Sequence, residues 1–138
     1  MEKVITIESA IEKSRQYFNN DELAATVFPT KYALTDKDGN LHEETPDDMH
    51  HRMAKEFARI EQNYPNPLSE KEIYNLFSSW EVVPQGSPMS GVGNPFQVQS
   101  LSNCFVIDSP EDSYAGILHT DQQQVQIMKR RGGVGFDI

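Results

Sequence analysis

The chain has 138 residues, one cysteine and a formal net charge of -9, from 21 acidic and 12 basic residues. This acidic excess argues against nonspecific binding to nucleic acid or to an anionic membrane surface. A single thiol excludes an internal disulfide framework and a metal site of the paired-cysteine kind. No membrane-spanning run or signal-peptide pattern is visible, so we expect a cytoplasmic protein.

The first segments of the chain carry signals for a helix and a turn. Residues 7–18 place apolar groups at helical spacing with charges between them, and residues 19–21 would end this helix. Residues 36–40 contain Asp-Gly and Gly-Asn pairs, which supply the positive φ that a tight reversal needs. We expect a small loop or hairpin there.

Two further helices are predicted from their start signals. Thr45 precedes a proline and two carboxylates, which together predict a helix over residues 46–63. Ser69 and Glu72 have the spacing of a capping box and open a shorter helix that ends near Phe77. In the longer helix, Met49, Met53, Phe57 and Ile60 are expected to fall on one apolar face.

The middle of the chain reads as extended and then irregular. Residues 80–83 favour an extended segment, and residues 84–95 are rich in Gly, Pro and Ser. The latter segment is predicted to be a long loop that carries Ser87, Met89 and Ser90. Loops of this kind often build binding sites.

The last third predicts a strand, a helix and a second strand. A buried strand over 101–107 and a turn at 108–111 precede a helix over 113–131. The glycines at 132–133 would end that helix, and 134–138 would begin the next strand. The apolar face of the helix is expected to contain Tyr114, Ile117, Leu118, Val125 and Met128.

Two features of this region have competing interpretations. Cys104 lies in the apolar strand, where it is either a redox thiol or an inert core residue. The Gly-Gly-x-Gly run at 132–135 fits a phosphate site, because glycines expose amide donors to a ligand. The same run also fits a helix C-cap followed by a tightly packed strand.

Histidines do not predict a metal site. The four in the chain are His42, His50, His51 and His119. Adjacent helix positions such as 50 and 51 point about 100° apart, which hinders chelation of one ion. We expect these histidines to face solvent or to pack, and we expect no metal.

The ordered motifs of the last third resemble the large, catalytic subunit of ribonucleotide reductase. They are Ser87-Pro88-Met89, Leu101-Ser102-Asn103-Cys104, Asp112-Ser113 and Lys129-Arg130-Arg131-Gly132-Gly133-Val134-Gly135. Upstream the resemblance continues through Asp21-Glu22-Leu23-Ala24, Lys31-Tyr32-Ala33-Leu34 and Glu44-Thr45-Pro46. It therefore covers nearly the whole chain.

This resemblance implies an α/β fold. Residues 1–83 would form a mainly helical N-terminal region, and residues 84–138 would begin a ten-stranded α/β barrel that this chain leaves incomplete. Some family members carry a separate N-terminal ATP-binding module, and the chain is expected to lack one.

The resemblance also assigns roles in ribonucleotide reduction. Cys104 would supply reducing equivalents to C2′ of the ribose and pair as a disulfide with a cysteine from a later strand. Ser87, Asn103 and Gly133 would contact the substrate. Asn103 replaces the serine that is commonest at its position, and an amide still donates and accepts hydrogen bonds.

A deoxynucleoside triphosphate or ATP effector would bind at the helix after the cysteine strand. The residues implied are Asp112, Ser113, Tyr114 and Lys129. The helix over 113–131 would also pair two large subunits. An N-cap with a solvated lysine is the simpler interpretation of the same residues.

Several partners follow from the resemblance. The chain would be the N-terminal piece of a split reductase or the part before an intein, inactive until a C-terminal polypeptide completes the barrel. The radical would come from a metal-bearing small subunit or from adenosylcobalamin, and a thioredoxin- or glutaredoxin-like protein would restore the thiols. A nucleotide-sensing module or an interaction fragment without chemistry is the alternative.

Overall fold

The computed structural model describes residues 4–138, which form two compact units. One unit ends at Gln97, and the other runs from Val98 to Ile138. The first three residues of the expected helical region 1–83 lie outside the described residues.

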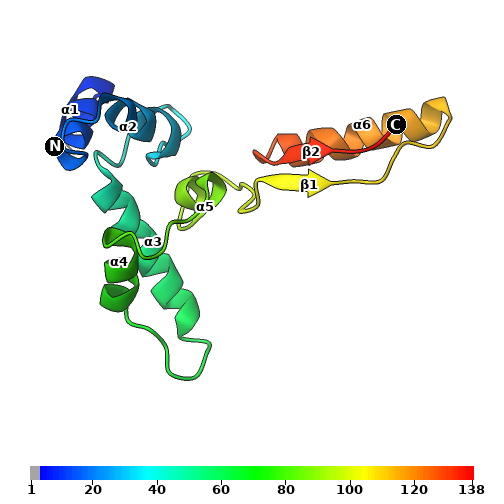
Figure 1. The fold of residues 1–138 in the computed structure, drawn as a ribbon. Coiled ribbons are helices and arrows are strands. Elements are labelled where there is room, and N and C mark those ends of the chain that lie inside the picture. Colours follow the sequence, from blue (N-terminus) through cyan, green and yellow to red (C-terminus); the bar gives the residue numbers. More distant parts are fainter. Residues whose placement is uncertain (1–3) are drawn as a thin grey trace. The chain divides into compact units, whose positions relative to one another are not determined.

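The first unit is built from helices. Figure 1 shows α1 (Ile7–Tyr17), α2 (Glu22–Val27), the π-helical turn η1 (Phe28–Tyr32), α3 (Pro46–Glu61), α4 (Glu70–Ser78) and α5 (Gly86–Gly91). The helices expected over 7–18, 46–63 and 70–77 are confirmed as α1, α3 and α4.

The starts of α3 and α4 are fixed by side chains that bind free backbone amides. The Asp48 carboxylate accepts the N–H of Thr45 at 3.0 Å. The Glu72 carboxylate accepts the N–H of Ser69 at 2.8 Å, and the Ser69 hydroxyl accepts the N–H of Glu72 at 3.3 Å. Hydrogen bonds from Ser69 lower the pKa of Glu72. Capping therefore begins both helices where the sequence predicts.

The turn expected at residues 36–40 is present. The Asp36 carboxylate accepts the N–H groups of Asp38 and Asn40, both at 2.9 Å, and Gly39 has a φ of 87°. Hydrogen bonds from the side chain and backbone of Asn40 lower the pKa of Asp36. Leu41 then forms single antiparallel bridges with Ile5 and Thr35.

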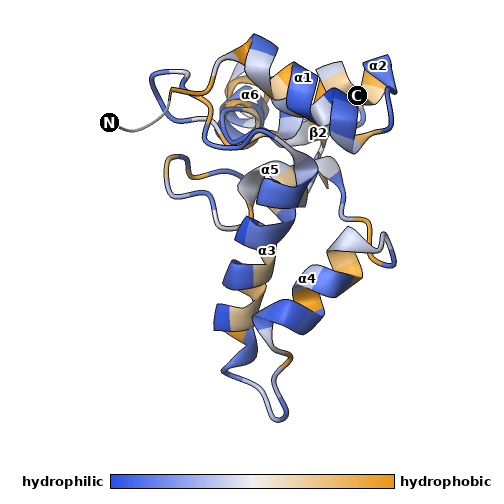
Figure 2. Cartoon of the chain, turned by 90° about the vertical axis from the view of Figure 1, so that its left-hand side faces the viewer, coloured by the Kyte–Doolittle hydropathy of each residue, from blue (hydrophilic) through white to orange (hydrophobic). Residues whose placement is uncertain are grey.

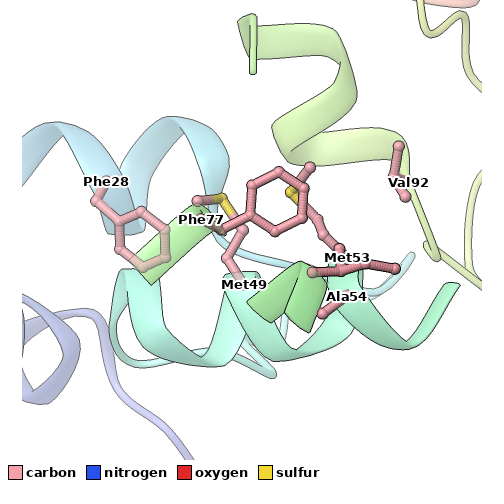
Figure 3. Packing of buried hydrophobic residues seen from close by; sticks show 7 residues of the cluster. Phe28, Met49, Met53, Ala54, Phe77 and Val92 are labelled. Carbon is pink, nitrogen blue, oxygen red and sulfur yellow. The ribbon is translucent and has the colours of Figure 1, made fainter. Parts of the chain in front are cut away.

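The core of the first unit lies where α3 packs against α4. Figure 2 shows both helices as amphipathic, with hydrophilic residues over much of their outer surfaces. Their inner faces join η1 and the segment after α5 in one buried cluster (Figure 3). Its members are Phe28, Met49, Met53, Ala54, Ile73, Phe77 and Val92.

Two predictions for the middle of the chain are wrong. Residues 80–83 do not form an extended segment, because Trp80 has a φ of 60° and its N–H bonds the Phe77 carbonyl at 3.1 Å, and a bend follows at residues 81–82. The segment 84–95 is not wholly irregular, because it contains α5. The partly buried Met89 of α5 packs against the core, which anchors this short helix.

The second unit contains a strand, a helix and a second strand. These are β1 (Cys104–Val106), α6 (Tyr114–Met128) and β2 (Gly133–Gly135). The strands pair in parallel, with Cys104 opposite Gly133, and Figure 1 shows α6 running alongside them. The expected order of strand, helix and strand is confirmed.

The elements of the second unit are shorter and more exposed than expected. Among the described residues β1 pairs with one strand only, and Val106 in it is 90% exposed, so the prediction of a buried strand is wrong. The helix ends at Met128 rather than residue 131, because Arg131 has a left-handed φ of 66°. The chain reverses there before the glycines.

The contacts divide the chain later than the boundary expected between residues 83 and 84. Helix α5 belongs to the first unit because Met89 and Val92 pack into its core. These contacts do not test where the expected barrel begins, and residue 84 as its start stays a prediction. None of the helices in the described part of the chain has the length and apolarity needed to cross a bilayer.

Candidate functional site

The sole cysteine lies at the start of β1. Its side chain is free and exposed, which excludes the interpretation of Cys104 as a buried core residue of the described chain. Gly133 is its register partner in β2, and the carbonyl of the adjacent Asn103 accepts the Gly133 N–H at 2.8 Å. Parallel pairing therefore brings Asn103, Cys104 and Gly133 together.

The glycine turn that precedes β2 is tightly packed. A Cβ on Gly132 would lie 2.6 Å from Ile127 Cγ2 and 2.8 Å from Phe105 Cε2. A side chain at position 132 would therefore fit only if the Phe105 and Ile127 side chains moved.

The backbone amides of the same turn donate hydrogen bonds to carbonyls of this chain. The Gly132 N–H bonds the Ile127 carbonyl at 3.2 Å, and the Gly133 N–H bonds Asn103. These two amides are therefore not available to hold a phosphate. The geometry favours the interpretation of the run as the end of a helix followed by a packed strand.

The expected substrate residue Ser87 lies in the first turn of α5. Its backbone carbonyl accepts a hydrogen bond from the Ser90 hydroxyl at 3.4 Å, and Ser90 also bonds Gly86 at 3.1 Å. Ser87 is partly buried and belongs to the first unit. Asn103, Cys104 and Gly133 belong to the second unit.

Three of the expected effector residues surround the N-terminus of α6. The Ser113 hydroxyl caps the helix by accepting the Gly116 N–H at 3.0 Å. Asp112 is exposed just before it, and Tyr114 is 89% exposed in the first turn. Polar groups that suit ribose hydroxyls therefore gather at this end of the helix.

Lys129 lies at the opposite end of α6, where it is the C-cap residue. At about 1.5 Å per residue, Ser113 and Lys129 are separated by roughly 24 Å along the helix axis. This distance is longer than one nucleoside triphosphate. The four expected effector residues are therefore not brought together within one chain.

An exposed apolar stripe connects the two ends of α6. At 100° per residue its members fall on one face of the helix. They are Tyr114 at 89% exposure, Ile117 at 46%, Leu118 at 67%, Val125 at 59% and Met128 at 54%. Within its own unit this face packs against nothing that would bury it.

An open groove lies beside the second unit's strand. It has a volume of about 580 Å³ and is lined by Val106, Ile107 and Asp108 from the strand side and by His119, Gln122, Gln123, Gln126 and Ile127 from α6. None of the predicted site residues lines it. The glutamine-rich face of α6 is the sequence signal that could have indicated this groove.

The adjacent histidines have packing roles. His50 is buried, its ring lies 5.4 Å from that of Trp80, and burial lowers its pKa. His51 stacks on Tyr74 with ring centroids 4.1 Å apart. Among residues 4–138 no group of three or more His, Cys, Asp or Glu side chains is placed to hold a metal ion.

Comparison with known proteins finds one family match and one similar curated protein. Residues 18–97 match the family described as the all-alpha domain of ribonucleotide reductase, and this match ends at the last residue of the first unit. A 67-residue stretch is 39% identical to the ribonucleoside-diphosphate reductase large chain of Neurospora crassa. That similarity covers 49% of this chain and 7% of the relative.

Proposed function

The chain belongs to the family of ribonucleotide reductase large subunits, and on this premise we propose that it forms the N-terminal part of a catalytic subunit that reduces ribonucleotides to 2′-deoxyribonucleotides. Its first unit corresponds to the all-alpha domain, and its second unit supplies the first strands and helix of a ten-stranded α/β barrel. The parallel pairing of β1 and β2 around α6 supports the barrel assignment. We place this enzyme in the cytoplasm.

Cys104 is the proposed reductant. It and a second cysteine, from another polypeptide segment, each give up a proton and an electron as they join in a disulfide. The ribose C2′–O bond breaks, C2′ gains hydrogen, and the hydroxyl leaves as water. The exposed thiol of Cys104 is the observation that carries this proposal, and a thioredoxin- or glutaredoxin-like dithiol resets the pair.

The substrate is proposed to contact Ser87, Asn103 and Gly133. Gly133 contributes by having no side chain, so a ligand is able to approach the backbone beside Cys104. The Asn103 side chain offers both a donor and an acceptor to ribose hydroxyls. The Ser87 hydroxyl is likewise able to donate and accept a hydrogen bond.

The effector is proposed to bind across two copies of α6. If these helices pack antiparallel through their apolar stripes, the N-terminus of one lies beside the C-terminus of the other. Asp112, Ser113 and Tyr114 of one copy then share a nucleoside triphosphate with Lys129 of the second copy. The separation of these residues within one chain and the exposure of the stripe support this arrangement.

The radical that starts the reaction is proposed to come from outside this chain. A metal-bearing small subunit and adenosylcobalamin are both compatible with the family, and either would act on groups of the completed barrel. The proposal includes no nucleic-acid or membrane partner, in keeping with the net charge of -9.

The proposed function is tested by reconstitution. The purified chain alone should show no reductase turnover, because radical chemistry and a disulfide need groups beyond its single cysteine. Mixing it with a polypeptide that carries the remaining barrel strands should produce deoxyribonucleotide, which is measured by chromatography of the products. Turnover by the chain alone, or no turnover with any completing polypeptide, would overturn the proposal.

A further inference from the structure

A buried ion pair joins α3 to the segment before it. The Arg52 Nε donates to Glu43 Oε1 at 2.6 Å, and Nη2 donates to Glu43 Oε2 at 3.3 Å. Both side chains are almost completely buried, with exposures of 9% and 4%. Burying two charges costs free energy that their mutual attraction alone often does not recover, so further partners are expected.

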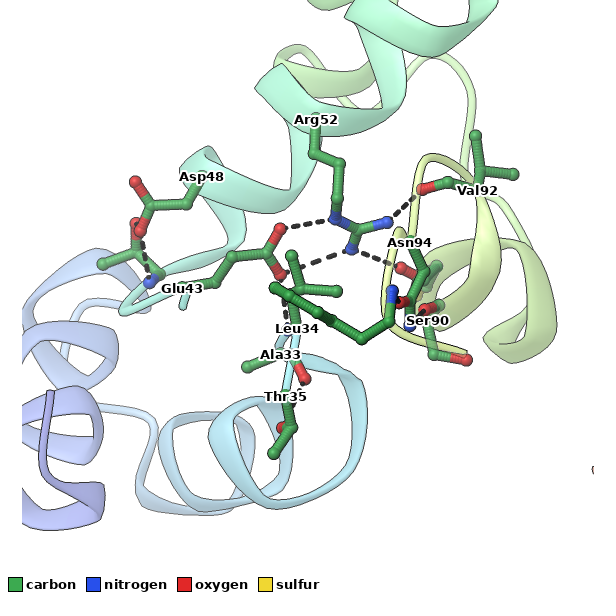
Figure 4. Close-up of polar contacts among 12 residues, drawn as sticks. Ala33, Leu34, Thr35, Glu43, Asp48, Arg52, Ser90, Val92 and Asn94 are labelled. Carbon is green, nitrogen blue, oxygen red and sulfur yellow. Dashed lines mark hydrogen bonds and ion pairs between the residues drawn. The ribbon is translucent and has the colours of Figure 1, made fainter. Parts of the chain in front are cut away.

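The further partners of Arg52 are backbone carbonyls of α5 and its exit. Nη2 donates to the Met89 carbonyl at 2.7 Å, and Nη1 donates to the Val92 carbonyl. Figure 4 shows the guanidinium reaching from α3 to this segment. Carbonyls at a helix end lack partners within the helix, and a cation stabilises the negative end of the helix dipole. Arg52 thus caps α5 from another helix.

Glu43 and the backbone at Gly93 restrain the Arg52 side chain from two directions. Glu43 Oε2 also accepts the Leu34 N–H at 2.8 Å, so the carboxylate is held by the chain after η1. Gly93, which follows α5, has a φ of 70°, and a Cβ there would lie 3.1 Å from Arg52 Cγ. The backbone that follows α5 therefore lies close to the aliphatic part of the Arg52 side chain.

We propose that Arg52, oriented by Glu43, is a positioning residue that holds α5 so that Ser87 meets the substrate. This inference rests on the proposed function for the role of Ser87. Ser87 lies two positions before Met89 in a helix of only 6 residues. Hydrogen bonds to the Met89 and Val92 carbonyls consequently restrain the rotation of the whole of α5 and with it the direction of Ser87.

The structural half of the proposal is tested by hydrogen exchange on the full chain. The amides of Met89 and Val92 bond the Gln85 and Pro88 carbonyls, both at 3.0 Å, and report the opening of α5. Arg52→Lys keeps the charge but loses the fork that reaches Glu43 and both carbonyls at once. We expect these two amides to exchange about tenfold faster, the effect of losing one charged hydrogen bond.

Two controls separate positioning from general stability. The amide of Ile73, at the start of α4, bonds the Ser69 carbonyl, and it should change less than those of α5, because Arg52 bonds Glu43 and the carbonyls of Met89 and Val92. Arg59→Lys makes the same chemical change in an exposed pair with Glu56 and should leave α5 unaffected. Glu43→Gln combined with Arg52→Met removes both charges together, and it should still open α5. Unchanged α5 exchange in both Arg52 variants would overturn the inference.

The functional half is tested in the assembled enzyme with cytidine diphosphate as substrate. Arg52→Lys should raise KM about tenfold and leave kcat within about twofold, because α5 binds substrate without taking part in the chemistry. A variant that merely lowered the folded fraction would lower kcat instead. If Ser87→Ala raises KM but Arg52→Lys leaves it unchanged, the inference is overturned. If Ser87→Ala also leaves KM unchanged, the assignment of Ser87 in the proposed function fails, while the exchange result still decides whether Arg52 holds α5.

Discussion

Cys104 in β1 and Gly133 in β2 lie directly opposite each other in the parallel pair. Register partners in a parallel sheet point their side chains to the same face, so Gly133 leaves the space beside the thiol open. A Cβ at Gly133 would have one non-neighbouring contact within 4 Å, the Asn103 carbonyl oxygen at 3.1 Å. The register therefore gives a ligand access to Cys104 from its neighbouring strand.

Replacing the thiol tests its redox role. In the assembled enzyme Cys104→Ser should reduce turnover by about a hundredfold or more, because a hydroxyl is close to a thiol in size but forms no disulfide. The dissociation constant for the ribonucleotide should change less than about twofold. Steady-state product formation and equilibrium binding measure the two quantities.

A matched experiment separates catalysis from sensing. If the chain only senses nucleotides, a bound nucleotide should alter the rate at which Cys104 is alkylated. The Cys104→Ser variant should then retain the full turnover of the assembled enzyme. Unchanged turnover in Cys104→Ser would make the thiol chemically inert in spite of its exposure.

A composite effector site predicts complementation between two variants. Asp112→Ala and Lys129→Ala, each tested alone, should weaken binding of a deoxynucleoside triphosphate, because every site in either dimer lacks one group. In a mixture, hybrid dimers regain one intact site from the unchanged Asp112 of one copy and the unchanged Lys129 of the other. Effector binding and effector-driven dimerisation should therefore recover in part, as measured by sedimentation.

The controls for this experiment are the separate variants and the double variant. A mixture of Asp112→Ala with the double variant forms no intact site and should show no recovery. If the mixture of single variants binds no better than its components, the two ends of α6 do not share a ligand, and the simpler roles of helix cap and solvated lysine hold.

The packing at Gly132 predicts unequal effects of two glycine substitutions. Gly132→Ala should destabilise the second unit by about 1–3 kcal/mol, because the new methyl group overlaps Phe105 and Ile127. Gly135→Ala is the control, since a Cβ there meets nothing within 4 Å. Hydrogen exchange of the β1 and β2 amides measures both, and equal protection in the two variants would contradict the packing.

Burial of His50 predicts a loss of stability in mild acid. Burial lowers its pKa from the ordinary 6.5, partly opposed by nearby Asp47 and reinforced by His51. Below about pH 6.5 the unfolded chain gains a proton that the folded chain resists, so the free energy of unfolding falls as the pH is lowered from about 7 to 5.

Urea unfolding of two variants isolates this effect. His50→Leu should show a shallower decline over that pH range, whereas His51→Gln, at an exposed position, should keep most of the wild-type decline, because burial is the main cause of the lowered His50 pKa. The carboxylates with lowered pKa, Asp36, Glu56 and Glu72, lose their contributions only at lower pH. An unchanged pH profile in His50→Leu would show that another group titrates in this window.

Local signals in the sequence determined the parts of the fold that depend on neighbouring residues. Thr45, Ser69 and Ser113 begin helices because their side chains or nearby carboxylates bind amides within one turn. The family resemblance was likewise predictable, and the match over residues 18–97 confirms it. The pairing of Asn103 and Cys104 with the glycine turn followed from the order of strand, helix and strand.

Only the tertiary structure decided the features that depend on distant residues. Helix α5 replaces a predicted loop because Arg52, far earlier in the chain, binds its last carbonyls, and nothing local marks Arg52 or Glu43 for that role. Cys104 is exposed rather than buried because β1 has one neighbouring strand in the described chain. Periodicity predicts which face of an element is apolar, but the neighbours brought by folding decide whether that face is covered.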